Sequence, residues 1–267
     1  MTKISILGCG WLGVPLAKTL IENGFTVNGS TTSIEKLLTL ENVGISPFLI
    51  ELGEGSIKGN ISEFLEGSQI LIIDIPPKLR GISTENFVAK INYIIPFIEK
   101  AGIKKVVFVS STSVYSDENI LVTEETFPNP DTESGKQLVA CEKLLQNNSN
   151  FETTVLRFGG LIGDDRNPIR FLAGRNNIEN PNAPINLIHQ EDCIGIIIKI
   201  IDSNCWGETF NAVAPFHPSR EDYYTQKAKE FQLELPIFAA SKPSIGKTII
   251  SDKLEKVLNY QFLKDTL

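Results

Sequence analysis

Three glycines close to the N-terminus constrain the fold of this chain more than any other feature. Residues 3–7 are largely apolar and β-branched, a composition typical of a buried parallel strand. Gly8, Gly10 and Gly13 follow with the spacing G-x-G-x-x-G, and leucines then recur every fourth residue, as they do on one face of a helix. The pattern predicts a strand, a tight turn and a helix in direct succession.

The turn has the chemistry of an anion-binding site. Gly8 permits the tight turn, Gly10 lets a pyrophosphate approach the backbone, and Gly13 lets the helix pack closely on the strand. The helix N-terminus adds unpaired N–H groups and the positive end of the helix dipole. An ordinary glycine-rich turn is the alternative interpretation, but the strand before the glycines and the helix after them favour a dinucleotide. We therefore predict that a dinucleotide contacts Gly8, Gly10, Trp11, Leu12 and Gly13.

The composition excludes several classes of protein and of site. The 267 residues carry a net charge of −7, whereas a broad nucleic-acid surface requires a basic excess. There is no charged-then-apolar leader and no apolar run long enough to span a bilayer, so we expect a cytoplasmic protein with no membrane partner. The cysteines form no C-x-x-C pair, and His189 and His217 are too few for a multi-histidine metal site. We therefore expect free thiols and no bound metal.

The end of the second strand bears on which cofactor the chain prefers. An NAD-binding site usually has an acidic residue about 20 residues after the glycines, where it bonds the ribose 2′-hydroxyl. This chain has Ser30, Thr31 and Thr32 there, with no acid before Glu35 and with Lys36 just beyond. These side chains would tolerate a 2′-phosphate, so they favour NADP over NAD. The same residues also fit a helix-capping box, T-x-x-E, and both interpretations can hold together.

Strand and helix patterns alternate along the chain up to residue 158. Apolar runs lie at 47–52, 69–75 and 104–110, with helical patterns between them, which is typical of right-handed β-α-β crossovers and a parallel sheet. The sequence thus predicts an α/β protein with a Rossmann-type doubly wound parallel sheet and a smaller C-terminal substrate-binding lobe. We expect residues 1–160 to form the NAD(P)-binding core and residues 161–267 to form the lobe, interwoven with the core in a single structural domain.

The fourth strand stops at a pair of prolines. In a doubly wound sheet the ligand lies beyond the carboxyl ends of the strands, so Ile75, Pro76 and Pro77 should line the nucleotide. Ser110, at the end of the fifth strand, is a further candidate contact by the same rule. A rigid loop without ligand contact explains the prolines equally well.

Several segments match one family in the same order along the chain. After the glycine turn comes a strand that ends V-S-S-T-S-V-Y at 109–115, followed by a sixth strand with its loop at 156–163. A segment leading into a lobe helix lies at 186–192, and a late strand lies at 209–213. This order resembles the extended short-chain dehydrogenase/reductases, and more narrowly their NAD-dependent epimerase/dehydratase branch, which acts on nucleotide sugars. The resemblance implies an NAD(P) cofactor, a small polar substrate such as a nucleotide sugar, and a homodimer.

The catalytic residues of that family carry over only in part. The family uses a serine or threonine after the fifth strand and Tyr-x-x-x-Lys on the next helix, and Ser111 fits the first position. Ser134 and Leu138 stand at the tyrosine and lysine positions. Lys136 lies two residues from Ser134, so it points about 200° around the helix and cannot share that face. The chain therefore resembles the atypical members of the family, which keep the nucleotide fold and lack this dyad.

Two residues are candidates for the missing proton donor or acceptor. Tyr115 lies near the end of the fifth strand and could face the nicotinamide, or it could pack under the loop. His189 could act as an acid or base, or it could make a structural hydrogen bond at the start of the following helix. The favoured function is an atypical NAD(P)-dependent oxidoreductase or epimerase, with Ser111, Tyr115 and His189 as catalytic candidates. The alternative is a non-catalytic NAD(P)-binding redox sensor or regulatory protein.

Three arginines follow Gly163 in the segment where a substrate lobe would begin. Arg166, Arg170 and Arg175 would suit the recognition of a phosphate or a carboxylate. A solvated loop is the commoner role of such arginines, and the sequence leaves both roles open.

Overall fold

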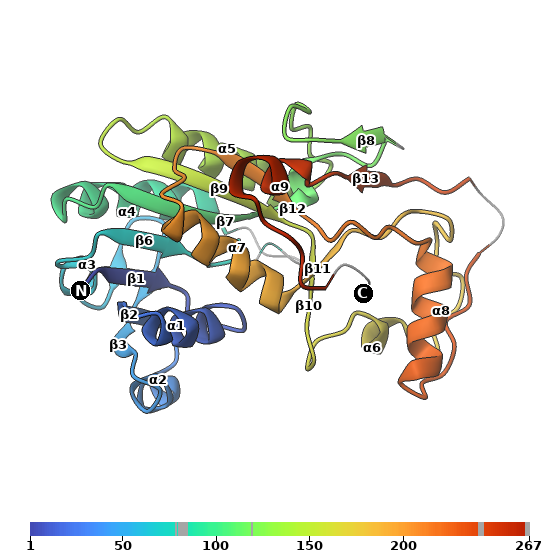
Figure 1. Cartoon of the computed structure of the whole chain (residues 1–267), viewed down its shortest axis with the longest axis horizontal. Coiled ribbons are helices and arrows are strands. Elements are labelled where there is room, and N and C mark those ends of the chain that lie inside the picture. The colour runs from blue at the N-terminus through green and yellow to red at the C-terminus, as the bar shows by residue number, and fades with distance from the viewer. Residues whose placement is uncertain (78, 80–84, 119, 240–242, 265–267) are drawn as a thin grey trace.

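A parallel sheet organises the part of the chain that the computed structural model describes, which is residues 1–77, 79, 85–118, 120–239 and 243–264. Its seven strands lie in the order β12-β9-β7-β6-β1-β2-β3 (Figure 1). They are β1 (Lys3–Leu7), β2 (Thr26–Thr31), β3 (Ser46–Leu49), β6 (Ile70–Ile73), β7 (Lys105–Ser111), β9 (Glu152–Phe158) and β12 (Thr209–Ala212). Every pairing in this sheet is parallel. The chain winds outward from β1 to β3, crosses back to β6 and winds outward again, which confirms the predicted doubly wound fold.

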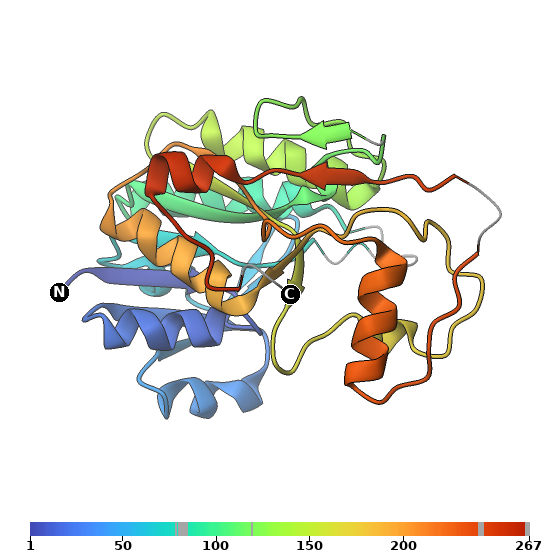
Figure 2. The same ribbon diagram turned by 45° about the vertical axis from the view of Figure 1, so that its right-hand side comes forward.

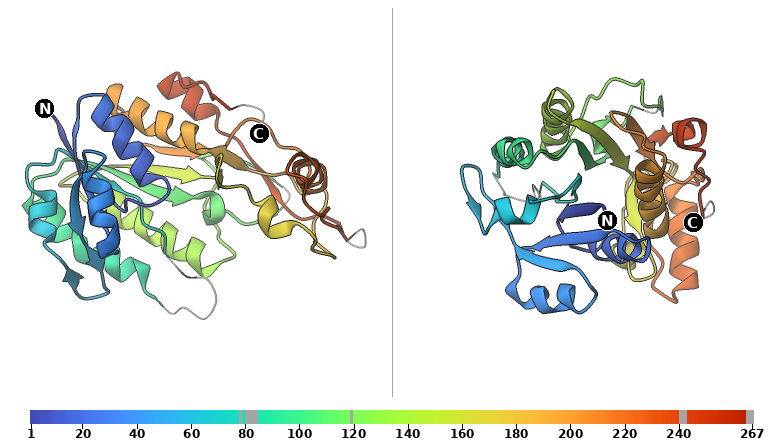
Figure 3. Two further views of the ribbon diagram at one scale, coloured as in Figure 1. Left: turned by 90° about the horizontal axis from the view of Figure 1, so that it is seen from below. Right: turned by 60° about the vertical axis from the view of Figure 1, so that its left-hand side comes forward.

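Helices cover both faces of this sheet (Figure 3). One face carries α1 (Gly13–Glu22), α7 (Gln190–Asp202) and α9 (Asp252–Leu258), and the other carries α3 (Ile61–Leu65), α4 (Phe87–Lys100) and α5 (Glu133–Gln146). Strand β6 shows why both faces need cover. Its residues are all buried and alternate between two cores, with Ile70 and Ile72 on the α1 side and Leu71 and Ile73 on the α4 side. No helix in the described residues is both long and apolar enough to cross a membrane.

A smaller lobe follows β9 and lies beyond the carboxyl end of that strand (Figure 2). Its elements are β10 (Gly160–Ile162), α6 (Ile169–Leu172), β11 (Leu187–His189), α8 (Arg220–Glu230) and β13 (Lys247–Ile249), which pairs with β8 (Ile120–Val122). The lobe has a small apolar core of its own, in which α6 and α8 meet. Between these elements, α7 and β12 return to the main sheet, so core and lobe alternate along the chain after residue 160.

The third strand is shorter than the apolar run at 47–52 predicts. β3 ends at Leu49, and the next two residues form β4 (Glu51–Leu52), which pairs antiparallel with β5 (Ile57–Lys58) outside the main sheet. Gly59 closes this hairpin with a φ of +94°, and a Cβ there would come 1.9 Å from the carbonyl oxygen of Leu49. The hairpin thus folds back onto the end of β3 and stops the strand.

The helix-capping box predicted at Thr32 is wrong. The segment begins with a 3-10 turn, η1 (Ile34–Lys36), before α2 (Leu37–Glu41), and no side chain caps it. Ser33 instead donates its hydroxyl to the Glu35 carboxylate at 2.5 Å, and the Ser33 N–H donates to Thr31 Oγ1 at 3.2 Å. These local bonds replace the cap, because short polar side chains compete with the helix for the same backbone groups.

Candidate functional site

The glycine loop between β1 and α1 is shaped by close backbone contacts. Gly8 has a φ of +112°, and a Cβ there would come 2.2 Å from the carbonyl oxygen of Asp74. A Cβ on Gly13 would come 2.3 Å from the carbonyl oxygen of Gly8. Gly10 differs, because a Cβ there would meet no atom within 4 Å. The loop is fixed from β2, where Ser30 accepts a hydrogen bond from the Gly8 N–H at 2.9 Å.

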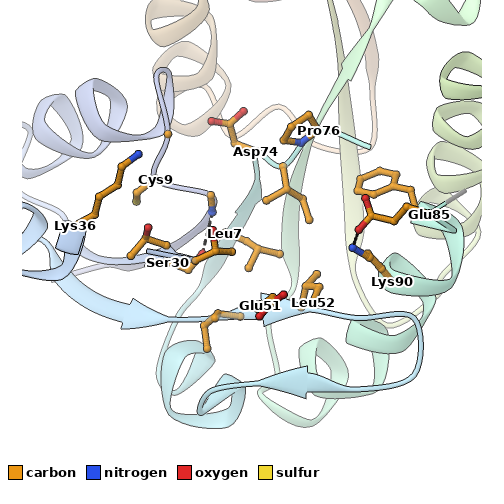
Figure 4. A pocket seen from close by; sticks show the side chains of 17 residues that line it. Leu7, Cys9, Ser30, Lys36, Glu51, Leu52, Asp74, Pro76, Glu85 and Lys90 are labelled. Atoms are coloured by element: carbon orange, nitrogen blue, oxygen red, sulfur yellow. Dashed lines mark hydrogen bonds and ion pairs between the residues drawn. The ribbon is translucent and has the colours of Figure 1, made fainter. Parts of the chain in front are cut away.

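The loop forms one wall of a cleft of about 450 Å³ at the carboxyl ends of the central strands (Figure 4). Of the residues that the sequence predicts to bind a cofactor, those that line the cleft are Gly8, Gly10, Ser30, Thr31, Thr32, Ile75 and Pro76. Lys36, which we associated with a 2′-phosphate, also lines it. Pro77 and Ser110 are not among the lining residues. The glycine loop, the end of β2 and the end of β6 are thus brought together at one site.

Trp11, Leu12 and Gly13 lie at the start of α1 rather than on the cleft wall. Leu12 and Gly13 are buried, so any contact they make with a ligand would come from the main chain. In the described part of the chain, the main-chain N–H groups of Trp11 and Leu12 make no hydrogen bond. Unpaired N–H groups at a helix N-terminus are well suited to bind a phosphate.

Other lining residues did not emerge from the sequence patterns. Glu51, Leu52 and Asp74 follow the ends of β3 and β6, so the rule that ligands lie beyond carboxyl ends would have found them. Glu85, Phe87 and Lys90 come from the start of α4, and no local signal marks them. Glu85 and Lys90 form an ion pair that Figure 4 shows on the opposite side of the cleft from the glycine loop.

Asp74 is an acidic side chain that lies against the glycine loop. Its carboxylate would be 3.4 Å from a Cβ on Gly13, and it also lines the cleft. Burial raises the pKa of Asp74 from 3.8 to about 8, because the surroundings solvate the charged form poorly. At neutral pH the carboxyl group is therefore mostly protonated, and it adds little negative charge beside the glycine loop.

Replacing Asp74 with asparagine should make the stability of the protein less dependent on pH. The pKa of Asp74 is about 8 in the folded chain against 3.8 as a model value, so its stabilising contribution is complete below pH 3.8 and is lost as the pH rises to 8. We expect the Asp74→Asn variant to match the wild type near pH 4 and to exceed it by up to about 6 kcal/mol at pH 8.5. Urea unfolding across this pH range measures the difference. The exposed Glu152 is the control, since Glu152→Gln should show no such trend; a flat Asp74→Asn difference would contradict the prediction.

Tyr115 does not face the cleft. It is 2% exposed, and its hydroxyl accepts a hydrogen bond from Arg157 Nη1 at 2.6 Å and donates one to Asn211 Oδ1 at 2.9 Å. Arg157 in turn pairs with Glu142, with Nη2 2.6 Å from Oε2. The hydroxyl of Ser110 donates to the same carboxylate at 2.5 Å. Burial raises the pKa of Tyr115, so this geometry favours packing under the loop over proton transfer.

Ser111 and His189 each cap a helical turn. Ser111 Oγ accepts a hydrogen bond from the Ser113 N–H at 3.1 Å, at the start of the 3-10 turn η2 (Thr112–Val114). His189 Nδ1 accepts from the Glu191 N–H at 3.3 Å and caps α7. The structural role that we left open for His189 is therefore present. Neither side chain lines the cleft, and both lie apart from the residues gathered there.

Helix α5 presents no cation at the position of the family's lysine. Leu138 is buried in the core on the α4 side of the sheet, and Lys136 is exposed. Ser134 is half-buried at the start of the helix. The helix approaches the η2 turn closely, because a Cβ on Gly135 would come 2.3 Å from the carbonyl oxygen of Ser113.

Comparisons with known proteins identify relatives along nearly the whole chain. No family model matches it. It is 33% identical to YeeZ of Escherichia coli K12 over 264 residues, which is 98% of this chain and 96% of YeeZ. UDP-glucuronic acid 4-epimerase from Bacillus cereus has been solved with NAD and also with UDP-glucuronic acid and NAD. Its NAD complex matches this structure with a TM-score of 0.80, at 17% identity over 97% of this chain and 93% of the epimerase chain.

A short-chain dehydrogenase/reductase superfamily protein from Agrobacterium tumefaciens with bound NAD has a TM-score of 0.79, at 15% identity over 97% of this chain and 92% of that one. At these identities the two solved structures show a shared fold, while the likeness to YeeZ extends to the sequence. The chain therefore belongs to the family of YeeZ and has the fold of the NAD-dependent epimerase/dehydratase branch of the short-chain dehydrogenase/reductases.

Proposed function

We propose that this chain binds NAD(P) in the cleft beside the glycine loop. The observation that carries the proposal is the open space and the unpaired N–H groups at the glycine loop. Space is open at Gly10, and the N–H groups of Trp11 and Leu12 are unpaired in the described residues. A pyrophosphate needs close access to the backbone together with N–H donors, and this loop offers both. The NAD bound by the Bacillus cereus and Agrobacterium proteins supports the same ligand here.

We further propose that the chain is an atypical oxidoreductase or epimerase acting on a small polar substrate such as a nucleotide sugar. Bound NAD(P) would supply a hydride acceptor or donor. Ser111 is our candidate for orienting the reacting oxygen, because it follows β7 as the family's serine does. Tyr115 is the weaker candidate, since its hydroxyl is buried and already bonded to two side chains. Ser111 and His189 each accept a main-chain hydrogen bond, so that ground favours neither over the other.

A non-catalytic redox sensor is the second candidate function. The feature that favours it is the apolar Leu138 at the position of the family's lysine, together with the buried Tyr115. A sensor must bind oxidised and reduced cofactor with different affinities, because only such a difference shifts an equilibrium. We also propose a cytoplasmic location, on the strength of the free cysteines, and a homodimer from the family resemblance.

We propose that the residues at the end of β2 give the site a preference for NADP over NAD. Ser30, Thr31 and Thr32 line it with Lys36, and Figure 4 shows the Lys36 side chain reaching into it. We expect Lys36→Glu to weaken NADP+ binding by about tenfold, because it removes a cation and adds an anion beside the 2′-phosphate. NAD+ binding should change by less than about twofold. Calorimetry with both nucleotides measures this. Lys18→Glu, on the exposed side of α1, makes the same charge change elsewhere and should leave both affinities unaltered.

Titration of the protein with NADPH, NADP+, NADH and NAD+ tests the proposed function. Binding of both redox states, followed by turnover of a nucleotide sugar, would support the enzyme. A strong preference for one redox state without any turnover would support the sensor. No binding of any of the four at millimolar concentration would refute both, and the cleft would then have another ligand.

A further inference from the structure

The glycine loop is held from the C-terminal lobe by a tight turn, residues 163–166. Gly163 and Arg166 close the turn with two main-chain hydrogen bonds of 2.9 and 3.0 Å. The indole N–H of Trp11 donates to Asp165 Oδ1 at 2.8 Å. Gly163 lies so close to the Trp11 ring that a Cβ would come 2.8 Å from Cζ2. A glycine at 163 is therefore what lets this turn lie against the loop.

A second contact holds the same loop residue from α7. Gln190, the first residue of that helix, donates its side-chain N–H to the Trp11 carbonyl oxygen at 2.7 Å. Trp11 thus has its ring and its main chain tied to two different elements that follow residue 160. The position of the N–H groups at the start of α1 depends on both ties.

Arg166 stacks its guanidinium on the face of Trp11, with Cζ 4.9 Å from the ring centroid. Within the described residues, its side chain makes no ion pair or hydrogen bond, even though Asp164 and Asp165 precede it. A stacked guanidinium keeps the N–H donors at its edge free for a planar or tetrahedral anion. The arginine is therefore held in place by an aromatic ring while its donors stay available.

Arg166 and Trp11 lie outside the cleft wall, and among the described residues that line the cleft no cation comes from the glycine loop or from the end of β6. Among the described residues that line it, the cationic side chains are Lys36, near the end of β2, and Lys90, which pairs with Glu85 on the far side. Asp74 contributes the opposite charge whenever it is ionised. A pyrophosphate bound at the loop would therefore meet N–H dipoles but no full positive charge from these elements.

The charges of Arg166 and Asp74 both act on the buried Cys193 thiol. Burial raises the pKa of the Cys193 thiol on α7, the charges of Asp192 and Asp74 raise it further, and the charge of Arg166 lowers it. The cation and the Asp74 carboxyl are thus both close enough to act on one buried sulfur. Trp11, on which the Arg166 guanidinium stacks, lies between Gly10 and Gly13 in the loop that Asp74 approaches closely.

We propose that Arg166 is a pyrophosphate-binding residue of the nucleotide site, supplied by the C-terminal lobe and held over the glycine loop by Trp11. The inference rests on the proposed binding of NAD(P). It gives the lobe a part in cofactor binding in addition to any part in substrate binding. It also assigns the Trp11 side chain a positioning role that its half-buried place beside the loop would otherwise leave unexplained.

The test compares Arg166→Gln with Arg170→Gln. Arg170 is the matched control, because it lies in the same segment and stacks on Phe231 at 5.5 Å, away from the glycine loop. Dissociation constants are measured by calorimetry for NADP+, which has a pyrophosphate, and for adenosine 2′-monophosphate, which has none. We expect Arg166→Gln to weaken NADP+ binding by about tenfold or more and to leave adenosine 2′-monophosphate binding unchanged. Arg170→Gln should alter neither.

Different outcomes separate the two claims. Wild-type binding of NADP+ with an Arg166→Gln affinity within about twofold would overturn the role of Arg166 and leave the nucleotide site standing. Equal losses for both ligands would show that the arginine acts on the fold of the loop and would also overturn the role. Failure of the wild type to bind NADP+ would overturn the proposed function and this inference together.

A fluorescence measurement locates the ligand independently of affinity. The chain has only 2 tryptophans, so Trp206→Phe leaves Trp11 as the single reporter. Addition of NADP+ should change the Trp11 emission, and Arg166→Lys, which keeps the charge but loses the planar stack, should give weaker binding with the same direction of change. An emission unaffected by saturating NADP+ would place the dinucleotide away from the Trp11–Arg166 pair.

Discussion

Replacing Gly10 with valine should weaken NADP+ binding by at least about 100-fold while leaving the protein folded. A Cβ at this position would meet no atom within 4 Å, and the residue is not in the left-handed region of backbone conformation. A Cβ therefore fits the free protein, and the valine methyl groups beyond it should fill the space where a pyrophosphate must approach the loop. Calorimetry gives the affinity, and thermal unfolding checks that the variant is as stable as the wild type.

Two comparisons make the Gly10 result specific. Gly55→Val is the control, because a side chain there also enters open space, in the β4–β5 hairpin and away from the cleft wall. It should leave both affinity and stability unchanged. Gly13→Val should instead unfold the loop, since its Cβ would clash with the Gly8 carbonyl. Undiminished NADP+ binding by Gly10→Val would place the nucleotide outside the glycine loop.

The second large effect is on stability and concerns the buried pair of Glu142 and Arg157. Their side chains are 2% and 8% exposed, and the ion pair also anchors Ser110 and Tyr115. We expect Glu142→Ala to lower the free energy of unfolding by about 3–5 kcal/mol, because it leaves the Arg157 charge buried without its partner. Urea unfolding followed by circular dichroism measures the loss.

Two further variants separate the buried charge from the ion pair as such. Removing both charges, with Glu142→Leu and Arg157→Met together, should restore much of the stability, since no unpaired charge is left inside. Asp252→Ala breaks an exposed pair with Lys256 at 3.4 Å and should cost less than about 1 kcal/mol. A Glu142→Ala loss as small as that of Asp252→Ala would contradict our account of the network.

The parts of the fold that could be predicted are those with local causes. The glycine spacing, the continuous apolar run of β6 and the leucines of α1 each depend on residues within one element. The early end of β3 could not be predicted in this way. It depends on the β4–β5 hairpin returning to Leu49, a contact that no periodicity records.

The candidate site also contains residues that could be predicted from local patterns and residues that depend on distant contacts. The ends of β1, β2 and β6 follow from the general rule for doubly wound sheets, and they supply the cleft residues that we expected. Tyr115 shows the limit of that rule. Its position after β7 allowed a place in the cleft, but its orientation is set by Arg157 on β9 and Asn211 on β12, which are distant in the chain. Likewise, Lys90 reaches the cleft only because of where α4 begins.

The position of β12 has a consequence for the order in which this chain acquires its structure during synthesis. β12 is the outermost strand beside β9, yet it leaves the ribosome only after α6, β11 and α7 have been made. Until then β9 is the edge of the growing sheet, with unpaired main-chain groups along a strand that is largely buried in the finished fold. During synthesis the edge of β9 is thus exposed to wrong pairing until residues 209–212 dock beside it.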